Sequence, residues 1–336
     1  MSAAKRIWVL VEISNGKVKP VSFEVIHAAR VLADSLGCQV DALYLSDEEP
    51  SAVDSLISHG ANRVIVLKHS RLKSFVLDSW LAAFEPVVHE RNPYLILFAA
   101  TPHGKELAAS LSARLNVALA TDCVWVEAGS SDHINIRRPV YAGKALSYLV
   151  LSGSGPHILS LRPNVFRGPG PDTSRSGEIE VIDVQLPVDE LVLKIKEVVR
   201  ETGEGLDITE ARVVVSGGLG MQEAENFKFL KDLARVLGGA VGASRPVVDN
   251  QWRHYSNQVG QTGRTVQPDL YIACGISGAV QHLAGMSSSK CIVAINKDAS
   301  APIFSVADYG IVGDALEILP VLTDEFKRVL DPKSGS

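Results

Sequence analysis

The sequence predicts an α/β protein with two domains, each organised around a β-sheet whose strands run mostly parallel. Short apolar runs of strand length alternate with segments whose apolar residues recur at helical spacing, which is typical of parallel sheets covered by helices. At 336 residues the chain is longer than one typical domain. A polar stretch at 201–205, Glu-Thr-Gly-Glu-Gly, has the composition of a linker. We therefore expect an N-terminal domain at 1–203 and a second domain at 204–336.

The first domain should contain a mostly parallel α/β sheet with antiparallel additions. Apolar runs of strand length occur at 7–13, 40–45, 64–67 and 94–100, with helix-like segments between them at 23–36, 52–59 and 75–90. Beyond residue 119 the strands become shorter and are separated by hairpin-length links, which would extend the sheet with antiparallel strands. These shorter strands are expected at 123–127, 134–142, 146–151 and 157–162. A strand at 179–185 and a helix at 191–199 complete the domain.

The second domain is expected to be a doubly wound α/β domain. Its strands are expected at 212–216, 240–243, 270–274, 291–295 and 309–312, and its main helices at 222–237, 279–286 and 314–330. Several of these strands end in Gly, Ser or Asn. Open α/β sheets bind ligands outside the carboxyl ends of their strands, so we expect a binding site at this edge.

Composition and charge argue against several classes of partner. With a formal net charge of −5 and no dense cluster of Lys and Arg, the chain does not have the profile of a nucleic-acid-binding protein. No apolar run reaches the ~18–20 residues that span a bilayer, so no direct membrane insertion is expected. The N-terminus lacks the pattern of a signal peptide, which favours a cytoplasmic location. The scattered cysteines are expected to be reduced and buried: Cys38, Cys123, Cys274 and Cys291.

The sequence contains no constellation typical of catalysis. It has no paired-carboxylate motif, no G-x-S-x-G, no H-E-x-x-H and no metal-ligand spacing. The loop at 101–105 follows a strand and opens a helix, but it lacks P-loop spacing and is interpreted as an ordinary loop. We therefore assign no catalytic residue and no metal site.

A glycine-rich turn after the predicted strand at 270–274 is the best candidate for a ligand site. Gly275, Ser277 and Gly278 break the apolar pattern before a segment of helical composition. Ser277 is a plausible N-cap for that helix. A strand–turn–helix junction of this kind presents backbone N–H groups to an anion such as phosphate. The glycine spacing does not form G-x-G-x-x-G, so the turn alone does not identify a dinucleotide site.

The stretch from 270 to 296, L-Y-I-A-C-G-I-S-G-A-V-Q-H-L-A-G-M-S-S-S-K-C-I-V-A-I-N, resembles the FAD-binding signature of the electron transfer flavoprotein alpha subunit. The resemblance extends back through V-G-A-S-R at 241–245 and Q-V-G-Q-T-G at 258–263, and forward through A-P-I-F at 301–304 and A-D-Y-G-I-V at 307–312. It implies that the second domain is an FAD-binding domain. It also implies that the chain is an electron carrier subunit and not an enzyme.

The resemblance implies roles for three side chains at the flavin ring. Arg245 would lie against the isoalloxazine and favour the anionic flavin, a task that suits a guanidinium because it is always charged and planar. Thr262 would offer its hydroxyl to flavin N5, and His282 would approach the pyrimidine carbonyl. From the residues alone, Arg245 has an alternative role, since Asp249 lies four positions on and could pair with it.

The resemblance places further residues along the rest of the cofactor. Ser244, Val259, Gly260 and Gln261 would surround the ring, and Ser277, Gly278, Ala279, Val280 and Gln281 would cradle the ring, ribityl chain and pyrophosphate. Asn296, Asp314 and Ala315 would hold the adenosine end, although Asp314 could instead be the N-cap of the last helix. The family pattern commonly has an arginine in the first glycine turn, where this chain has Leu219. Leu219 is therefore left out of the predicted site.

The same resemblance implies a heterodimer. The first domain would pack on an electron transfer flavoprotein beta subunit, and the pair would carry electrons from acyl-CoA or other flavin dehydrogenases toward a quinone oxidoreductase, as in fatty acid oxidation. The alternative is the alpha subunit of an electron-bifurcating flavoprotein that uses NADH. Two further classes stay open, a self-contained flavin or nicotinamide dehydrogenase and a nucleotide-binding scaffold without redox chemistry.

Overall fold

The computed structural model describes residues 5–14, 16–48, 53–130, 133–141, 143, 145–153, 155–187 and 206–330. The chain forms two compact units, the first made of Met1–Val140 and Ala145–Val199, the second of Tyr141–Lys144 and Arg200–Ser336. The helix expected at 191–199 and the linker expected at 201–205 lie outside the described residues. The boundary expected at 203/204 lies there too and stays a prediction.

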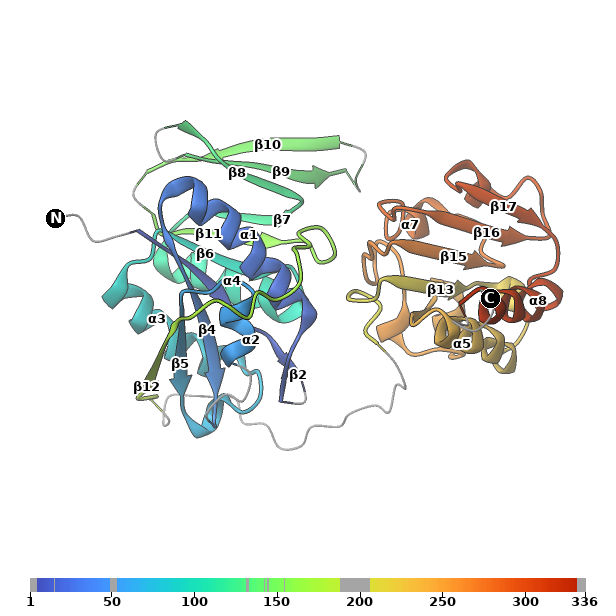
Figure 1. Cartoon of the computed structure of the whole chain (residues 1–336). Coiled ribbons are helices and arrows are strands. Elements are labelled where there is room, and N and C mark those ends of the chain that lie inside the picture. Colours follow the sequence, from blue (N-terminus) through green and yellow to red (C-terminus); the bar gives the residue numbers. More distant parts are fainter. Residues whose placement is uncertain are drawn as a thin grey trace. The chain divides into compact units, whose positions relative to one another are not determined.

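The first unit is built on a seven-stranded sheet in which every neighbouring pair of strands is parallel (Figure 1). In spatial order the strands are β12 (Glu178–Asp183), β5 (Arg63–Lys68), β4 (Gln39–Ser46), β1 (Arg6–Leu10), β6 (Leu95–Ala99), β11 (His157–Leu161) and β7 (Leu119–Cys123). Helices α1 (Pro20–Leu36) and α2 (Val53–Ser58) pack on one face, and α3 (Leu77–Arg91) and α4 (Pro102–Leu115) on the other. The predicted α/β class and parallel sheet are confirmed.

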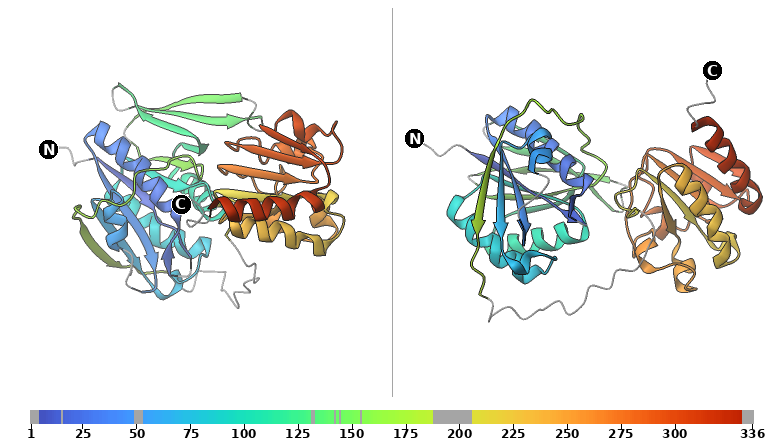
Figure 2. Two further views of the ribbon diagram at one scale, coloured as in Figure 1. Left: turned by 45° about the vertical axis from the view of Figure 1, so that its right-hand side comes forward. Right: turned by 60° about the horizontal axis from the view of Figure 1, so that its bottom comes forward.

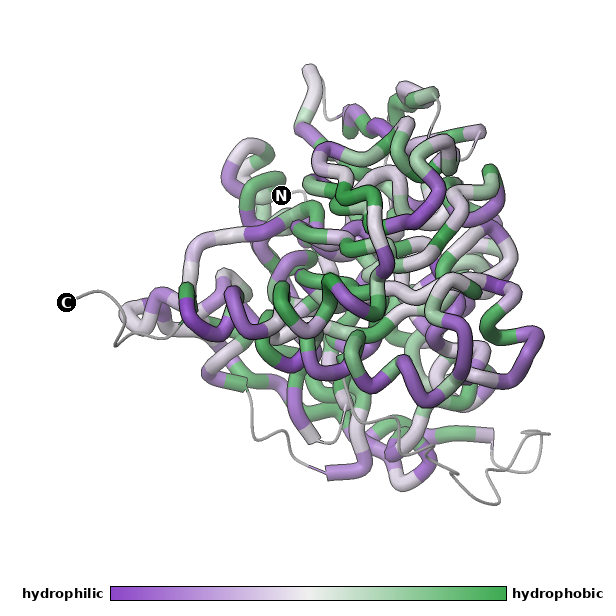
Figure 3. The backbone as a smooth tube through the Cα atoms, turned by 90° about the vertical axis from the view of Figure 1, so that its right-hand side faces the viewer, coloured by the Kyte–Doolittle hydropathy of each residue, from purple (hydrophilic) through white to green (hydrophobic). Residues whose placement is uncertain are grey.

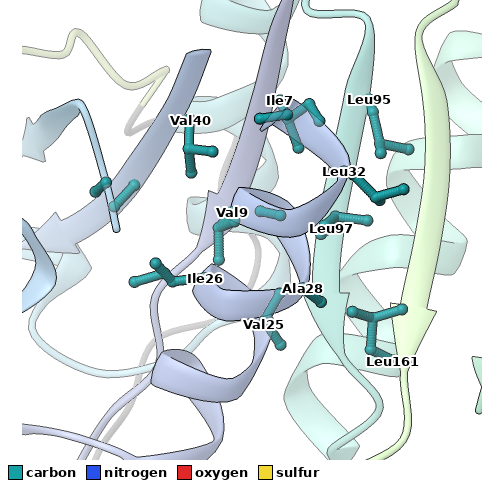
Figure 4. Packing of buried hydrophobic residues seen from close by; sticks show 14 of the residues in the cluster. Ile7, Val9, Val25, Ile26, Ala28, Leu32, Val40, Leu95, Leu97 and Leu161 are labelled. Carbon is teal, nitrogen blue, oxygen red and sulfur yellow. The ribbon is translucent and has the colours of Figure 1, made fainter. Parts of the chain in front are cut away.

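Helix α1 shows how the sequence specifies this packing. Its buried residues recur at helical spacing and include Val25, Ile26 and Leu32, which lie over strand residues such as Val9 and Leu97 (Figure 4). Proline in the first turn and Gly37 in the left-handed conformation (φ 65°) mark its two ends. The periodicity and the end signals agree, so this element could be predicted from sequence.

The antiparallel strands do not extend the main sheet as expected. β8 (Trp125–Ala128), β9 (Ile134–Val140) and β10 (Ala145–Leu151) form a separate three-stranded antiparallel sheet. Instead of pairing with β10 in a hairpin, β11 enters the main sheet between β6 and β7, parallel to both. All five residues of β11 are buried, whereas exposed positions alternate along β10. Burial on both faces therefore separates a central parallel strand from a solvated antiparallel one.

The second unit contains a five-stranded parallel sheet in the order β14 (Ala240–Ala243), β13 (Val213–Gly217), β15 (Leu270–Cys274), β16 (Ile292–Asn296) and β17 (Tyr309–Val312). Helices α5 (Phe227–Val236) and α8 (Ala315–Leu330) contact each other on one face (Figure 2). The other face is covered by loops and by the short elements α7 (Val280–Leu283) and η6 (Pro302–Ser305). Hydrophobic and hydrophilic stretches alternate along the chain (Figure 3).

The first helix of the second unit begins later than expected. Two single 3₁₀ turns, η3 (Leu219–Met221) and η4 (Ala224–Asn226), precede α5. Between them Gln222 adopts a positive φ of 70°, which an α-helix cannot contain. The helix predicted from 222 therefore starts at Phe227. In the described part of the chain, no helix has both the length and the apolar character needed to cross a membrane.

Candidate functional site

A pocket of ≈ 500 Å³ opens at the carboxyl edge of the second sheet, where β13 and β15 end side by side. The chain continues from β13 to β14 on one side, then returns to form β15 on the other. Open α/β sheets bind ligands at such a reversal of strand order. The lining residues come from the segments after β13, β14 and β15 and from the last residue of β16: Gly218, Leu219, Gly220, Ser244, Arg245, Pro246, Gln258, Val259, Gly260, Thr262, Gly275, Ile276, Ser277, Ala279, Gln281, His282 and Asn296.

Glycines allow the turns after β13 and β15 to touch through their backbones. A Cβ atom on Gly218 would lie 2.2 Å from the Gly275 carbonyl oxygen, and one on Gly220 would lie 2.6 Å from Gly275 Cα. The Gly220 amide donates a hydrogen bond to that carbonyl at 3.0 Å. Gly275 also has a φ of +61°. This wall of the pocket therefore consists of backbone from two turns. A side chain at any of these glycines would push the two turns apart.

The segment after β15 differs from the predicted capped helix. Only the four residues of α7 are helical, their N-cap is Ala279, and no side chain caps them. Ser277 lies before the helix, where its carbonyl accepts a hydrogen bond from the Ile303 amide at 3.0 Å. Gly278, with a φ of +88°, then turns the chain. The prediction of Ser277 as N-cap is therefore wrong, because the residue that directly precedes α7 is Ala279, two positions later.

The same turn still offers donors to an anion. Among the described residues, the amides of Ser277, Gly278 and Ala279 donate to no other group of the chain. Ser277 and Ala279 line the pocket. Successive N–H groups in a non-helical turn can form an anion-binding concavity. The predicted phosphate site is therefore supported by individual amides and not by the dipole of a long helix.

The loop at 258–264 contributes Gln258, Val259, Gly260 and Thr262 to the pocket lining and is fixed to α7. The Gln261 amide donates to the Gln281 carbonyl at 2.7 Å. Within the loop, the Gln258 side-chain amide donates to Thr262 Oγ1 at 3.1 Å. A hydroxyl that accepts one hydrogen bond keeps its own hydrogen for another acceptor. Thr262 can therefore donate to a ligand in the pocket that it lines.

Arg245 provides the positive charge of the pocket. It begins α6 (Arg245–Asp249) directly after β14, and its side chain is 65% exposed. Its Nε lies 3.4 Å from a carboxylate oxygen of Asp249, whose side chain is 60% exposed. The alternative pairing with Asp249 is thus present, but an ion pair this exposed contributes little to stability. The guanidinium can keep this contact or lie over a ligand ring.

His282 is the buried titratable group of the pocket. Only 6% of the residue is exposed, and its Nε2 lies 2.9 Å from the Tyr271 hydroxyl. Its Nδ1 is buried, without surface exposed to the pocket. Burial lowers the pKa of His282 to about 4, against a smaller opposing effect of the Val259 carbonyl. The imidazole is therefore neutral at physiological pH.

Asn296 and Asp314 lie where β16 and β17 end. Asn296 lines the pocket and donates its side-chain amide to the Ile276 carbonyl at 2.9 Å. Asp314 accepts a hydrogen bond from the Leu316 amide at 2.9 Å. It therefore caps α8, which is the alternative role considered from the sequence. It also pairs with Lys297 Nζ at 2.7 Å, and this hydrogen bond lowers the pKa of its carboxyl group.

Most of the predicted residues are brought together. Ten line the pocket: Ser244, Arg245, Val259, Gly260, Thr262, Ser277, Ala279, Gln281, His282 and Asn296. Five do not: Gln261, Gly278, Val280, Asp314 and Ala315. The pocket adds lining residues that the sequence prediction missed: Gly218, Gly220, Pro246, Gln258, Gly275 and Ile276. The glycine run at the end of β13 was the available signal for the first two, and Leu219, left out of the predicted site, lies among them.

Two family descriptions match the chain in sequence. Residues 7–187 match the electron transfer flavoprotein domain, and residues 207–287 match the electron transfer flavoprotein FAD-binding domain. The electron transfer flavoprotein subunit alpha of Bacillus subtilis is 44% identical over 97% of this chain and 98% of its own length. The chain belongs to the electron transfer flavoprotein alpha subunit family. The subunit alpha of Megasphaera elsdenii is 40% identical over 96% of this chain and 97% of the relative. Protein FixB of Rhizobium meliloti is 34% identical over 98% of this chain and 95% of its own length.

The family assignment makes FAD the cofactor of the second unit, and the pocket fits it in two respects. Backbone glycines line one wall, and the free amides at 277–279 can donate hydrogen bonds to a pyrophosphate. The described residues contain no group of three or more His, Cys, Asp or Glu side chains that could hold a metal ion.

The depressed pKa of His282 predicts a pH dependence of stability. Because the folded pKa is about 4 and the unfolded value is about 6.5, the unfolded chain binds one more proton between these values. Stability should therefore be complete above pH 6.5 and fall by on the order of 3 kcal/mol as the pH drops to 4. Chemical unfolding at several pH values tests this. His282→Gln should flatten the decline in this window, and an equally steep decline in the variant would contradict the assignment.

Proposed function

We propose that this electron transfer flavoprotein alpha subunit holds FAD along the carboxyl edge of its second sheet. The isoalloxazine would lie beside Arg245, Thr262 and His282. The pyrophosphate would meet the free amides at 277–279, and the adenosine end would lie toward Asn296 and Asp314. The observation that supports this most is the position of the pocket at the reversal of strand order, with hydrogen-bond donors among its lining residues.

When bound, FAD supplies a ring that accepts and releases electrons one or two at a time. The protein groups adjust the energy of that exchange. Arg245 places a permanent positive charge by the ring, which favours the reduced, negatively charged state. Thr262 and His282 add neutral hydrogen-bond donors at positions fixed by Gln258 and Tyr271. None of these groups needs to form a covalent bond, so the site suits a carrier.

We further propose that the chain pairs with an electron transfer flavoprotein beta subunit through its first unit and passes electrons from acyl-CoA or other flavin dehydrogenases to a quinone oxidoreductase. Support comes from the family and from relatives that match over nearly their full lengths. The alternative, an NADH-dependent bifurcating flavoprotein, differs in what the beta subunit binds. A cytoplasmic location stays a prediction. Of the four cysteines expected to be buried, Cys38, Cys123 and Cys274 are buried, whereas Cys291 is partly exposed.

The flavin content of the heterodimer tests this proposal. The two subunits are expressed together, and the purified complex is assayed for FAD per heterodimer and for a change in visible absorbance on adding NADH. One FAD that does not react with NADH but is reduced by an acyl-CoA dehydrogenase and its substrate would support the carrier. Two FADs, one of them reduced by NADH, would support bifurcation. A complex without flavin would contradict both.

Leu219 offers a gain-of-function test of the FAD position. It lines the pocket and is 48% exposed, so a longer side chain has room to reach the ligand. Leu219→Arg should tighten FAD binding, because a guanidinium near the pyrophosphate can form charge-assisted hydrogen bonds worth roughly 1.5–3 kcal/mol, or about ten- to hundredfold in Kd. Fluorescence titration of the apoprotein measures the Kd. An unchanged or higher value would show that the pyrophosphate lies elsewhere.

A further inference from the structure

A tyrosine beside the pocket belongs neither to the predicted site nor to the pocket lining. Tyr255 is 56% exposed, and its hydroxyl donates a hydrogen bond to the main-chain carbonyl of Thr262 at 2.6 Å. The direction of this bond is unambiguous, because a carbonyl oxygen can only accept. Thr262 does line the pocket. Tyr255 is therefore one hydrogen bond removed from the ligand.

The Thr262 main chain has one anchor among the described residues. Its amide donates to no other group of that part of the chain, and its carbonyl accepts only the hydrogen bond from Tyr255. The neighbouring bond within the loop runs from the Gly263 amide to the Gly260 carbonyl at 3.1 Å and does not include Thr262. The Gln258 side chain holds the Thr262 hydroxyl but not its backbone. The position of the Thr262 backbone therefore depends on Tyr255.

Tyr255 is itself fixed to the second sheet. It begins η5 (Tyr255–Asn257), a single 3₁₀ turn that the side chain of His254 caps. Asn257, at the end of this turn, donates its side-chain amide to the Val241 carbonyl of β14 at 3.0 Å. A tyrosine side chain has only two rotatable bonds before its ring is placed. The hydroxyl is therefore held at a defined position relative to the strand.

We propose that Tyr255 is a positioning residue, which fixes the Thr262 backbone so that the Thr262 hydroxyl faces the bound flavin. This inference rests on the proposed position of FAD beside Thr262. It adds a residue outside the pocket that affects the flavin potential without touching the flavin. A hydrogen bond weakens as its distance and angle leave their optimum, so a displaced Thr262 would stabilise the reduced flavin less. The potential should then fall.

The test is a double-mutant cycle on the flavin potential in the heterodimer. Tyr255→Phe keeps the ring and removes its hydroxyl, Thr262→Val keeps the shape of the side chain and removes its hydroxyl, and the third variant combines them. Thr262→Val should lower the first one-electron potential by the equivalent of roughly three- to tenfold, at most about 59 mV. Tyr255→Phe should lower it by the equivalent of about two- to fivefold, or about 18–41 mV. The double variant should shift no further than Thr262→Val alone, because Tyr255 acts through Thr262.

Tyr309→Phe is a matched control for the loss of a tyrosine hydroxyl. Tyr309 lies on β17 of the same unit, is 67% exposed and does not line the pocket. Its replacement should leave the potential unchanged. An equal shift in Tyr309→Phe and Tyr255→Phe would overturn the inference, because the effect would not depend on the contact with Thr262.

The outcomes separate this inference from the proposed flavin position. If Thr262→Val leaves the potential unchanged, the flavin does not lie at Thr262, and the proposed position fails together with the inference. If Thr262→Val lowers the potential but Tyr255→Phe does not, or if the two shifts add, the flavin position stands and the positioning role is wrong. Chemical unfolding of Tyr255→Phe completes the test. A loss of stability without a shift of the potential would make Tyr255 a structural anchor of the loop and nothing more.

Discussion

Arg245→Ala should lower the first one-electron potential of the bound FAD by about 40–90 mV. At ~4 Å and an effective dielectric constant near 20, a unit charge stabilises an opposite charge by about 4 kcal/mol. The arginine side chain is 65% exposed, so solvent should screen more than half of this and leave roughly 1–2 kcal/mol. For a one-electron couple, about 1.4 kcal/mol corresponds to about 59 mV. The potential should fall, and not rise, because the variant loses a cation that favours the reduced flavin.

Two control variants separate this electrostatic role from a structural one. Arg235→Ala removes an arginine of the same unit that is also exposed and paired with an aspartate, Asp232, but does not line the pocket. Asp249→Asn removes the carboxylate partner of Arg245 while keeping the guanidinium. Stepwise reductive titration should show little change in the first variant and an unchanged or slightly higher potential in the second. A shift of less than about 20 mV in Arg245→Ala would leave Arg245 with only its contact to Asp249.

The strands were the most predictable part of the fold. Runs such as Leu270–Cys274 are apolar throughout because helices and loops bury both faces of the sheet. The partners of β10 were less predictable. Leu146, Tyr148 and Val150 are 49%, 71% and 60% exposed, so an apolar strand that reads as core belongs to a partly solvated separate sheet. Which sheet a strand joins depends on its neighbours in space, and a sequence pattern of period two does not encode them.

The candidate site also has a predictable and an unpredictable part. Residues contiguous with the glycine turn and with the segment at 258–262 could be predicted because their order along the chain carries the resemblance. The contacts that hold these residues in place could not be predicted. Tyr271 reaches His282 from a strand eleven positions earlier, and Gln258 supports Thr262 by folding back within its own loop. The wrong prediction of Ser277 as an N-cap also reflects a contact that is distant in sequence. The Ile303 amide donates a hydrogen bond to the Ser277 carbonyl.

Gly275→Ala should cost far more than a change of one methyl group suggests. At a φ of +61°, alanine is strained by about 1 kcal/mol. In addition, its Cβ would lie 2.7 Å from Gly220 Cα and 2.8 Å from the Gly220 carbonyl carbon. These are backbone atoms that cannot rotate away, and overpacking of this kind costs about 1–3 kcal/mol more. Because the two turns would have to separate, we expect a loss of roughly 2–4 kcal/mol in unfolding free energy and at least tenfold weaker FAD binding.

Gly238→Ala is a matched control for this effect. Gly238 lies in the same unit and has nearly the same φ, +63°, but no atom lies within 4 Å of the Cβ position. Alanine there should cost only the backbone strain of about 1 kcal/mol and leave FAD binding unchanged. Urea unfolding and FAD titration of both variants measure the difference. Suppose that both variants lost the same unfolding free energy and that Gly275→Ala still bound FAD. The close contact between the turns after β13 and β15 would then not be what shapes the pocket. If only Gly275→Ala loses its FAD, the close approach of the two backbones is a requirement of the binding site.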